Sequence, residues 1–345
     1  MGDCACDVRL DQLDPNSPVS HFFLELTPDC NNFCPGCGSL NVRQPGLPPL
    51  PAAGWREIID KLNPTMPRLR ISGGEPTLHS EFKEIVAYIN FLGVHFSVFT
   101  NARWSNPEAV IDFLSEQRYL ECILVSIHGA RALSHETFTA TPGSFEETIA
   151  NVRRAVDAGL RVASSTVITR QNFFEMEDIY TLMSSLGVER VTINRYIGPS
   201  LPEIEPDETE LFTAINAIEK LATENHRAHA GTILRYGTPM PHCFTDNHSN
   251  GCMAGFVHAA IDPWGNLRPC SHTSLIAGNL FEQDFYEIWE SPVMKKWRND
   301  VLAQCDGCSI GDNCHGACLA QALWQKVSTD PLINPIYSIF TDRFH

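Results

Sequence analysis

The sequence predicts an α/β fold in which a partial (β/α)6 barrel is followed by a small cysteine-rich domain. Between about residues 20 and 225, six β-like apolar runs alternate with helix-length segments. This alternation favours a parallel sheet, because parallel neighbours need helical crossovers. Six units are fewer than the eight of a closed barrel, so we expect an open, curved sheet. After about residue 237 the sequence becomes rich in Cys, Gly, Pro and His and loses its apolar periodicity.

The six expected strands are short runs rich in β-branched and aromatic residues. They are residues 21–27, 68–72, 95–100, 122–127, 161–168 and 190–194. The helical segments between them include residues 80–92, 144–159 and 173–187. Ser144 and Glu147 have the spacing of a capping box, and Gly159 and Gly187 are expected as left-handed helix caps.

The change in composition predicts the domain boundaries. A tail of residues 1–19 precedes a partial barrel of residues 20–236, which ends in a linker and one more helix. The cysteine-rich domain covers residues 237–325, and residues 326–345 form a second tail. Because the cysteine-rich domain lacks the periodicity of a conventional core, we expect its fold to depend on bound metal.

The bulk composition excludes several classes of protein. No run approaches the ~18 apolar residues of a membrane span, and the N-terminus has no secretory signal pattern, so we expect a cytoplasmic protein without a membrane partner. In that reducing compartment, thirteen cysteines indicate metal binding rather than disulfides. The net charge of −16 opposes nucleic-acid binding, which relies on Lys and Arg to neutralise phosphates.

The first cysteine cluster directly follows the first expected strand. Cys30, Cys34 and Cys37 are spaced Cys-x3-Cys-x2-Cys, and no further cysteine follows until Cys122. Three thiolates suit three irons of a cubane, whereas structural zinc normally needs a fourth protein ligand. A zinc site would have to be completed by His21 or by Cys122, which we expect to be a buried core residue.

A second motif, Gly73-Gly74-Glu75, follows the second expected strand. Together with the cysteine loop, it resembles the radical S-adenosylmethionine (radical SAM) superfamily. The resemblance implies a [4Fe–4S] cluster on Cys30, Cys34 and Cys37, whose open iron chelates the amino and carboxylate groups of S-adenosylmethionine. One electron then cleaves the sulfonium and forms a 5′-deoxyadenosyl radical that abstracts hydrogen from a substrate.

The resemblance also implies which residues contact S-adenosylmethionine. The glycines allow close approach of the backbone to a ligand, and the Glu75 carboxylate or nearby backbone can accept hydrogen bonds from the ammonium group. The implied cofactor-binding residues are Gly73, Gly74, Glu75, Asn101, Ser126, Thr166 and Asn194. For the last four, the alternative is a polar strand residue whose hydrogen bonds are made within the fold.

The chain departs from the family pattern at two positions. Gly36 stands where many relatives carry an aromatic residue, so we expect an aromatic cover for the adenine from elsewhere, with Phe33 as the candidate. Thr139 stands where relatives often carry Arg, and Arg131 or Arg195 is the candidate for the missing charge contact.

The C-terminal third resembles the SPASM domain of radical enzymes, which holds auxiliary iron–sulfur clusters. The matching residues are Cys252, Gly265 and Cys270, then Cys305-x2-Cys308-x5-Cys314-x3-Cys318. The resemblance implies one auxiliary [4Fe–4S] cluster on Cys243, Cys252, Cys270 and Cys318. It implies a second on Cys305, Cys308 and Cys314, with Asp330, Asp342, His345, Cys4 or Cys6 as the remaining candidates for its fourth ligand. A four-cysteine zinc ribbon is the alternative.

The resemblance predicts an enzyme that modifies a ribosomally made peptide by crosslinking, excision, epimerisation or oxidation. Auxiliary clusters would take up the electron left after hydrogen abstraction. Because only about twenty residues precede the first strand, we expect a separate leader-peptide-binding protein, together with a reductant such as flavodoxin or ferredoxin. The alternatives are a tetrapyrrole or small-cofactor modifying enzyme and, in another class, a non-catalytic iron–sulfur electron carrier.

Overall fold

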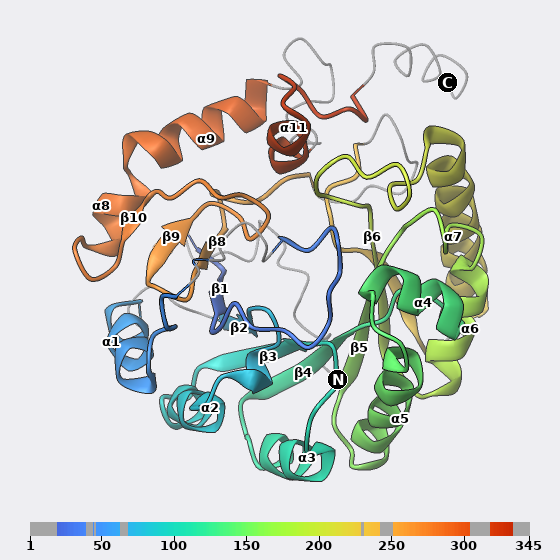
Figure 1. The fold of residues 1–345 in the computed structure, drawn as a ribbon, viewed down its shortest axis with the longest axis horizontal. Coiled ribbons are helices and arrows are strands. Elements are labelled where there is room, and N and C mark those ends of the chain that lie inside the picture. Colours follow the sequence, from blue (N-terminus) through green and yellow to red (C-terminus); the bar gives the residue numbers. More distant parts are fainter. Residues whose placement is uncertain are drawn as a thin grey trace.

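One curved sheet organises the fold of this computed structural model (Figure 1). The structure describes residues 19–38, 44, 46–62, 68–228, 231–241, 251–303 and 318–333. Within this part of the chain, ten strands lie in the order β10-β9-β8-β1-β2-β3-β4-β5-β6-β7. Strands β1 to β8 pair in parallel, and β9 and β10 add an antiparallel edge.

The six expected strands are confirmed. They are β1 (His21–Glu25), β2 (Arg68–Ser72), β3 (His95–Thr100), β4 (Leu120–Ser126), β5 (Val162–Val167) and β6 (Arg190–Asn194). Further strands that the sequence did not predict extend both ends: β7 (Ile233–Tyr236), β8 (His258–Ile261), β9 (Asn266–Arg268) and β10 (Gly278–Asn279). The cysteine-rich region therefore continues the same sheet through β8, which pairs with β1.

Helices cover the convex side of the sheet (Figure 1). The helices described before β7 are, in chain order, α1 (Ala52–Leu62), the short 3-10 helix η4 (Pro76–Leu78), α2 (Phe82–Phe91), α3 (Pro107–Ser115), α4 (Ala132–Thr139), α5 (Ser144–Asp157), α6 (Met176–Ser185) and α7 (Glu208–Ala228). After β10 the described residues form α8 (Phe285–Trp289), α9 (Pro292–Ala303) and α11 (Leu319–Gln325). None of the helices in these described segments is long and apolar enough to cross a membrane.

Alternation along the strands separates an outer apolar core from a polar interior. On β1, Phe22 and Leu24 pack into the main hydrophobic core. His21 precedes Phe22 and therefore points to the opposite face of the strand, where its ring stacks on His258 of β8 with the ring centroids 4.9 Å apart. Burial lowers the pKa of His258 to about 3, so this imidazole is neutral at physiological pH.

The capping box predicted at Ser144 is wrong. Helix α5 starts at Ser144 itself, and its hydroxyl is hydrogen-bonded to the Thr139 hydroxyl at 2.8 Å. Glu147 instead forms an ion pair with Arg103 at 2.8 Å. Tertiary partners have therefore replaced the local cap. The left-handed conformations expected of Gly159 and Gly187 are confirmed, with φ of +83° and +80°.

Candidate functional site

The cysteine loop and the glycine motif meet at the carboxyl edge of the sheet. The loop, residues 26–38, follows β1, and the glycine motif follows the neighbouring strand β2. Two backbone hydrogen bonds of 2.7 Å join them, from Gly74 N to Thr27 O and from Glu75 N to Asp29 O. The motifs separated in sequence therefore lie in one place, where functional loops of parallel sheets gather.

Gly73 and Gly74 are required by this contact. Gly73 has a φ of +140°, and a Cβ atom there would lie 2.6 Å from the Thr27 carbonyl oxygen. A Cβ atom at Gly74 would overlap the Asp29 carbonyl oxygen. These glycines thus let the backbone after β2 pack directly against the backbone just before Cys30. This contact fixes the start of the cysteine loop.

Glu75 is fully buried and ties two loops together. Its carboxylate accepts hydrogen bonds from Thr77 N at 3.2 Å and Oγ1 at 2.7 Å, from Thr100 Oγ1 at 2.9 Å and from Asn101 N at 2.8 Å. Burial raises the pKa of Glu75, and these hydrogen bonds act in the opposite direction. The side chain therefore links the loop after β2 to the loop after β3.

Asn101 connects that second loop to the first cysteine. Its Nδ2 lies 3.7 Å from Cys30 Sγ and donates a hydrogen bond of 2.6 Å to Asn31 Oδ1. Its carbonyl oxygen accepts a hydrogen bond of 2.9 Å from Thr148 Oγ1 on α5. Asn101 is thus placed beside the sulfur of Cys30.

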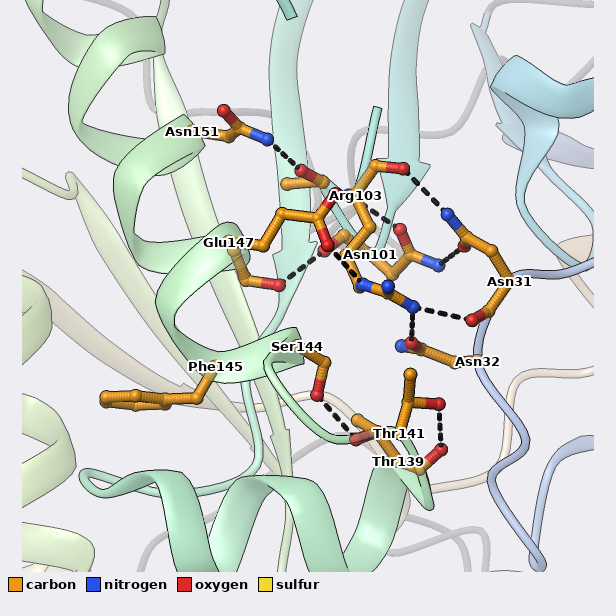
Figure 2. Close-up of polar contacts among 12 residues, drawn as sticks. Asn31, Asn32, Asn101, Arg103, Thr139, Thr141, Ser144, Phe145, Glu147 and Asn151 are labelled. Atoms are coloured by element: carbon orange, nitrogen blue, oxygen red, sulfur yellow. Dashed lines mark hydrogen bonds and ion pairs between the residues drawn. The ribbon is translucent and has the colours of Figure 1, made fainter. Parts of the chain in front are cut away.

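Arg103 braces the cysteine loop against α5 (Figure 2). Its Nη1 donates hydrogen bonds to the Asn31 carbonyl oxygen at 2.5 Å and to Asn32 Oδ1 at 2.9 Å. Its Nε donates to Glu147 Oε2 at 2.8 Å. The sequence did not single out Arg103, because its partners lie 72, 71 and 44 residues away.

The first cysteine loop fits an iron–sulfur cluster. Burial raises the pKa of the Cys30 and Cys34 thiols, so these sulfurs need bound cations to stay ionised. Two N–H donors already face Cys30 Sγ, the Asn32 backbone at 3.4 Å and Asn101 Nδ2 at 3.7 Å. Among the described residues, no three of His, Cys, Asp or Glu converge on a single ion. In a cubane each thiolate binds a separate iron.

Tyr196, just after β6, contacts this loop where an aromatic cover was expected from Phe33. Phe33 is 68% exposed, whereas Tyr196 is buried. A Cβ atom at Gly36 would lie 2.6 Å from Tyr196 Oη, so the ring packs directly against Gly36. Tyr196 Oη donates a hydrogen bond of 2.9 Å to the Pro199 carbonyl oxygen. The sequence signal for this contact is Gly36 itself.

The remaining implied cofactor contacts differ in position. Ser126 and Asn194 are the last residues of β4 and β6, at the carboxyl edge of the sheet. Asn194 Nδ2 donates a hydrogen bond of 2.9 Å to Ser165 Oγ. Thr166 is fully buried, and its hydroxyl donates a hydrogen bond of 2.6 Å to the Ile127 carbonyl oxygen. Thr166 therefore has the bonding of a structural strand residue.

Both arginines suggested as charge contacts form ion pairs within the protein. Arg131 forms an exposed ion pair with Asp178 at 3.0 Å. Arg195 is buried in an ion pair with Asp330 at 2.7 Å. Thr139 is also buried, and its carbonyl oxygen accepts a hydrogen bond of 2.9 Å from Phe33 N in the cysteine loop.

Three cysteines of the C-terminal third come together in a second hydrophobic cluster. Cys252, Cys270 and Cys318 pack there with Trp297 and with Ile197 from the segment after β6. Burial raises the pKa of Cys318 to about 12, so a bound metal is needed to keep this thiolate. These three residues fit the ligand set implied for one auxiliary cluster. The other expected ligands and candidates lie outside the described residues: Cys243, Cys305, Cys308, Cys314, Asp342, His345, Cys4 and Cys6. Cys122 is buried in β4, as expected.

The two cysteine regions touch each other. A Cβ atom at Gly38, next to Cys37, would lie 3.3 Å from the Ser271 carbonyl oxygen and 3.5 Å from His272 Nδ1. Ser271 directly follows Cys270. The first cysteine loop and the segment that follows Cys270 therefore lie in contact.

Two parts of the chain match known families. Residues 24–183 match the radical SAM superfamily, and residues 252–314 match the SPASM iron–sulfur cluster-binding domain. The mycofactocin maturase MftC of Mycobacterium tuberculosis H37Rv is 30% identical over 318 residues, covering 89% of this chain and 80% of that protein. The AdoMet-dependent heme synthase of Methanosarcina barkeri is 26% identical over 86% of this chain and 90% of its own length.

Solved structures share the fold. Streptococcus suis SuiB bound to S-adenosylmethionine superimposes with a TM-score of 0.76 at 16% identity, covering 92% of this chain and 77% of that chain. Native anSMEcpe with bound AdoMet gives a TM-score of 0.74 at 14% identity, covering 94% of this chain and 95% of that chain.

Proposed function

This chain belongs to the radical SAM superfamily and carries a SPASM domain, and we propose that it modifies a ribosomally made peptide. The match to mycofactocin maturase carries the proposal, because it spans 89% of this chain. A PqqA peptide cyclase is also similar, at 24% identity over 92% of this chain. The superfamily consists of enzymes, so the non-catalytic electron carrier is not supported.

In this proposal the chain holds its cofactors with two adjoining sets of cysteines. Cys30, Cys34 and Cys37 bind the first [4Fe–4S] cluster, and Cys252, Cys270 and Cys318 bind an auxiliary one together with Cys243. When bound, these groups and S-adenosylmethionine supply the 5′-deoxyadenosyl radical that abstracts hydrogen and an acceptor for the electron left on the substrate. A second auxiliary cluster on Cys305, Cys308 and Cys314 remains part of the proposal.

The chain's own residues keep the first loop in place. Glu75 and Asn101 hold the loop after β3 beside Cys30. Arg103 fixes the backbone at Asn31. The backbone of Gly73 to Glu75, together with Ser126 and Asn194 at the strand ends, is our proposed surface for S-adenosylmethionine. Because the contact at Gly38 joins the two cysteine regions, a peptide residue bound there would lie near both.

We also propose two protein partners: a small leader-peptide-binding protein that presents the substrate, and a flavodoxin or ferredoxin that supplies electrons. SuiB, which shares the fold, has been solved bound to its precursor peptide SuiA. If purified enzyme and peptide alone turn over as fast as the mixture with the leader-binding protein, that partner is excluded.

A second candidate is an enzyme of tetrapyrrole metabolism. It is favoured by the heme synthase of Methanosarcina barkeri, whose similarity covers 86% of this chain. The two candidates differ in the molecule from which hydrogen is removed.

The deciding experiment uses anaerobically reconstituted protein, reductant and S-adenosylmethionine. One arm adds a peptide encoded by a short neighbouring reading frame, and the other adds a porphyrin precursor. We expect a mass change in the peptide, together with 5′-deoxyadenosine, in the first arm. Substrate-dependent product in the porphyrin arm alone would reject the peptide proposal and favour the second candidate.

A further inference from the structure

One end of the Arg195 guanidinium, Nη1, lacks a hydrogen-bond partner among the described residues. It follows β6 directly, and its side chain is 3% exposed. Nη2 donates to Asp330 Oδ1 at 2.7 Å. Nη1 is buried and has no hydrogen-bond partner among the residues that the structure describes. Leaving a charged donor unsatisfied in the interior is costly, so Nη1 calls for an acceptor.

Asp330 links this arginine to a cysteine. Its Oδ1 also accepts a hydrogen bond of 3.0 Å from Leu332 N. Its Oδ2 accepts a hydrogen bond of 2.6 Å from Cys318 N. The fully buried carboxylate therefore fixes the backbone of Cys318 at the start of α11 and holds the guanidinium beside it.

Arg195 and Asp330 bring two buried charges close to Cys318. Arg195 and Asp330 are both buried and together carry no net charge. Asp330 accepts hydrogen bonds from both Arg195 Nη2 and Cys318 N, so the guanidinium is held close to Cys318. A cluster held by Cys318 would therefore lie near this buried guanidinium.

Arg195 also lies between the two cysteine regions. The next residue, Tyr196, packs against Gly36 of the first loop. Gly198 N donates a hydrogen bond of 2.8 Å to Gln321 Oε1 on α11, the helix that begins after Cys318. The segment after β6 therefore spans from the first loop to the auxiliary cysteines.

We propose that Arg195 is a positioning residue that raises the reduction potential of the auxiliary cluster bound by Cys318, while Asp330 opposes it. This inference rests on the proposed auxiliary cluster. A nearby cation favours the form that holds the extra electron, and a nearby anion disfavours it, with an effect that is strong in a low-dielectric interior. The pair thus adjusts how readily the cluster accepts an electron from substrate.

The test is a redox titration of the full chain, followed by electron paramagnetic resonance. The background carries alanine at Cys30, Cys34 and Cys37 so that the first cluster is absent, and the relevant signal is the one that Cys318→Ala removes. Arg195→Gln should shift the reduction equilibrium at least tenfold toward the oxidised form, about 59 mV lower for a one-electron couple. Asp330→Asn should shift it in the opposite direction.

The double variant Arg195→Gln/Asp330→Asn should return toward the parent potential, because both charges are gone. Arg195→Lys keeps the charge and should remain close to the parent. The control is Arg161→Gln, which removes an arginine from an exposed ion pair with Glu189 next to the amino end of β5.

The inference would be overturned if the potentials of Arg195→Gln and Asp330→Asn differed from the parent by no more than that of the Arg161→Gln control. It would also be overturned if the two variants shifted the potential in the same direction. If Arg195→Gln loses its cluster, Asp330→Asn decides the question, and a potential for Asp330→Asn no higher than that of the parent would overturn the inference. Absence of any signal that depends on Cys318 in the parent would instead reject the auxiliary cluster itself.

Discussion

Replacement of Gly36 by alanine should disturb the first cysteine loop through Tyr196. The new Cβ atom would lie 2.6 Å from Tyr196 Oη and 2.8 Å from Cζ, well inside the ~3.5 Å of an ordinary contact. The ring cannot retreat easily. Its Oη is held by a hydrogen bond of 2.9 Å to the Pro199 carbonyl oxygen, and a Cβ atom at Gly198 would also lie only 2.8 Å from Oη.

The magnitude follows from this overlap. Inserting a methyl group into a packed site costs about 1–3 kcal/mol, and removing a buried aromatic ring costs about 3–5 kcal/mol. If the two changes were independent, their costs would add. Because the clash exists only while the ring is present, we expect Gly36→Ala to cost almost nothing when Tyr196 is already alanine. The coupling energy should therefore be about 1–3 kcal/mol.

The assay is anaerobic urea unfolding of both single variants and the double variant, with iron per chain measured in parallel. Gly231→Ala is the matched control, because a Cβ atom there meets nothing within 4 Å. Gly36→Ala should also lower the iron held by the first loop. The packing argument would be refuted if Gly36→Ala lowered the unfolding free energy no more than Gly231→Ala. It would also be refuted if Gly36→Ala lowered it equally when Tyr196 is already alanine.

Two further predictions concern the loop brace and the buried histidines. Arg103→Met removes three hydrogen bonds of a mostly buried guanidinium. It should lower the unfolding free energy by about 2–4 kcal/mol and reduce the iron held per chain. The control Arg161→Met, at an exposed ion pair, should change the unfolding free energy and the iron content by little. His258 has its pKa lowered from 6.5 to about 3, so the unfolded chain binds the proton more tightly between these values and stability falls on acidification. From pH 7 to 5 this residue should remove about 2 kcal/mol. The slope of the unfolding free energy against pH should therefore be smaller in His258→Phe than in the wild type. It should be unchanged in His95→Phe, which alters an exposed strand residue. Equal slopes in the two variants would contradict this prediction.

The six central strands could be predicted because each is an apolar run bounded by turn residues and followed by a helical segment. β7 and β8 were missed because each spans only four residues, too few for a pattern, and their pairing joins distant parts of the chain. The capping box failed for a similar reason, since the side chains of Ser144 and Glu147 bond to tertiary partners that local spacing does not show.

The shared loop of Cys30, Cys34 and Cys37 could be predicted from spacing, because Cys-x3-Cys-x2-Cys keeps the three thiols close together in the chain. The residues that hold those loops could not. Arg195 and Asp330 are 135 positions apart, and Arg103 lies about 70 residues from the loop that it braces. Phe33 was a reasonable aromatic candidate by proximity in sequence. The ring that reaches Gly36 instead comes from the segment after β6.

The central claim is that the Cys30–Cys37 loop generates a radical that takes hydrogen from a peptide. A precursor peptide deuterated at its modified residue tests this directly, with the deuterium content of 5′-deoxyadenosine as the measurement. We predict deuterium transfer with the wild-type protein and none with Cys34→Ala, which should still hold its auxiliary iron. Transfer that is unchanged in Cys34→Ala, or product formed from the peptide with no deuterium in 5′-deoxyadenosine, would contradict the account.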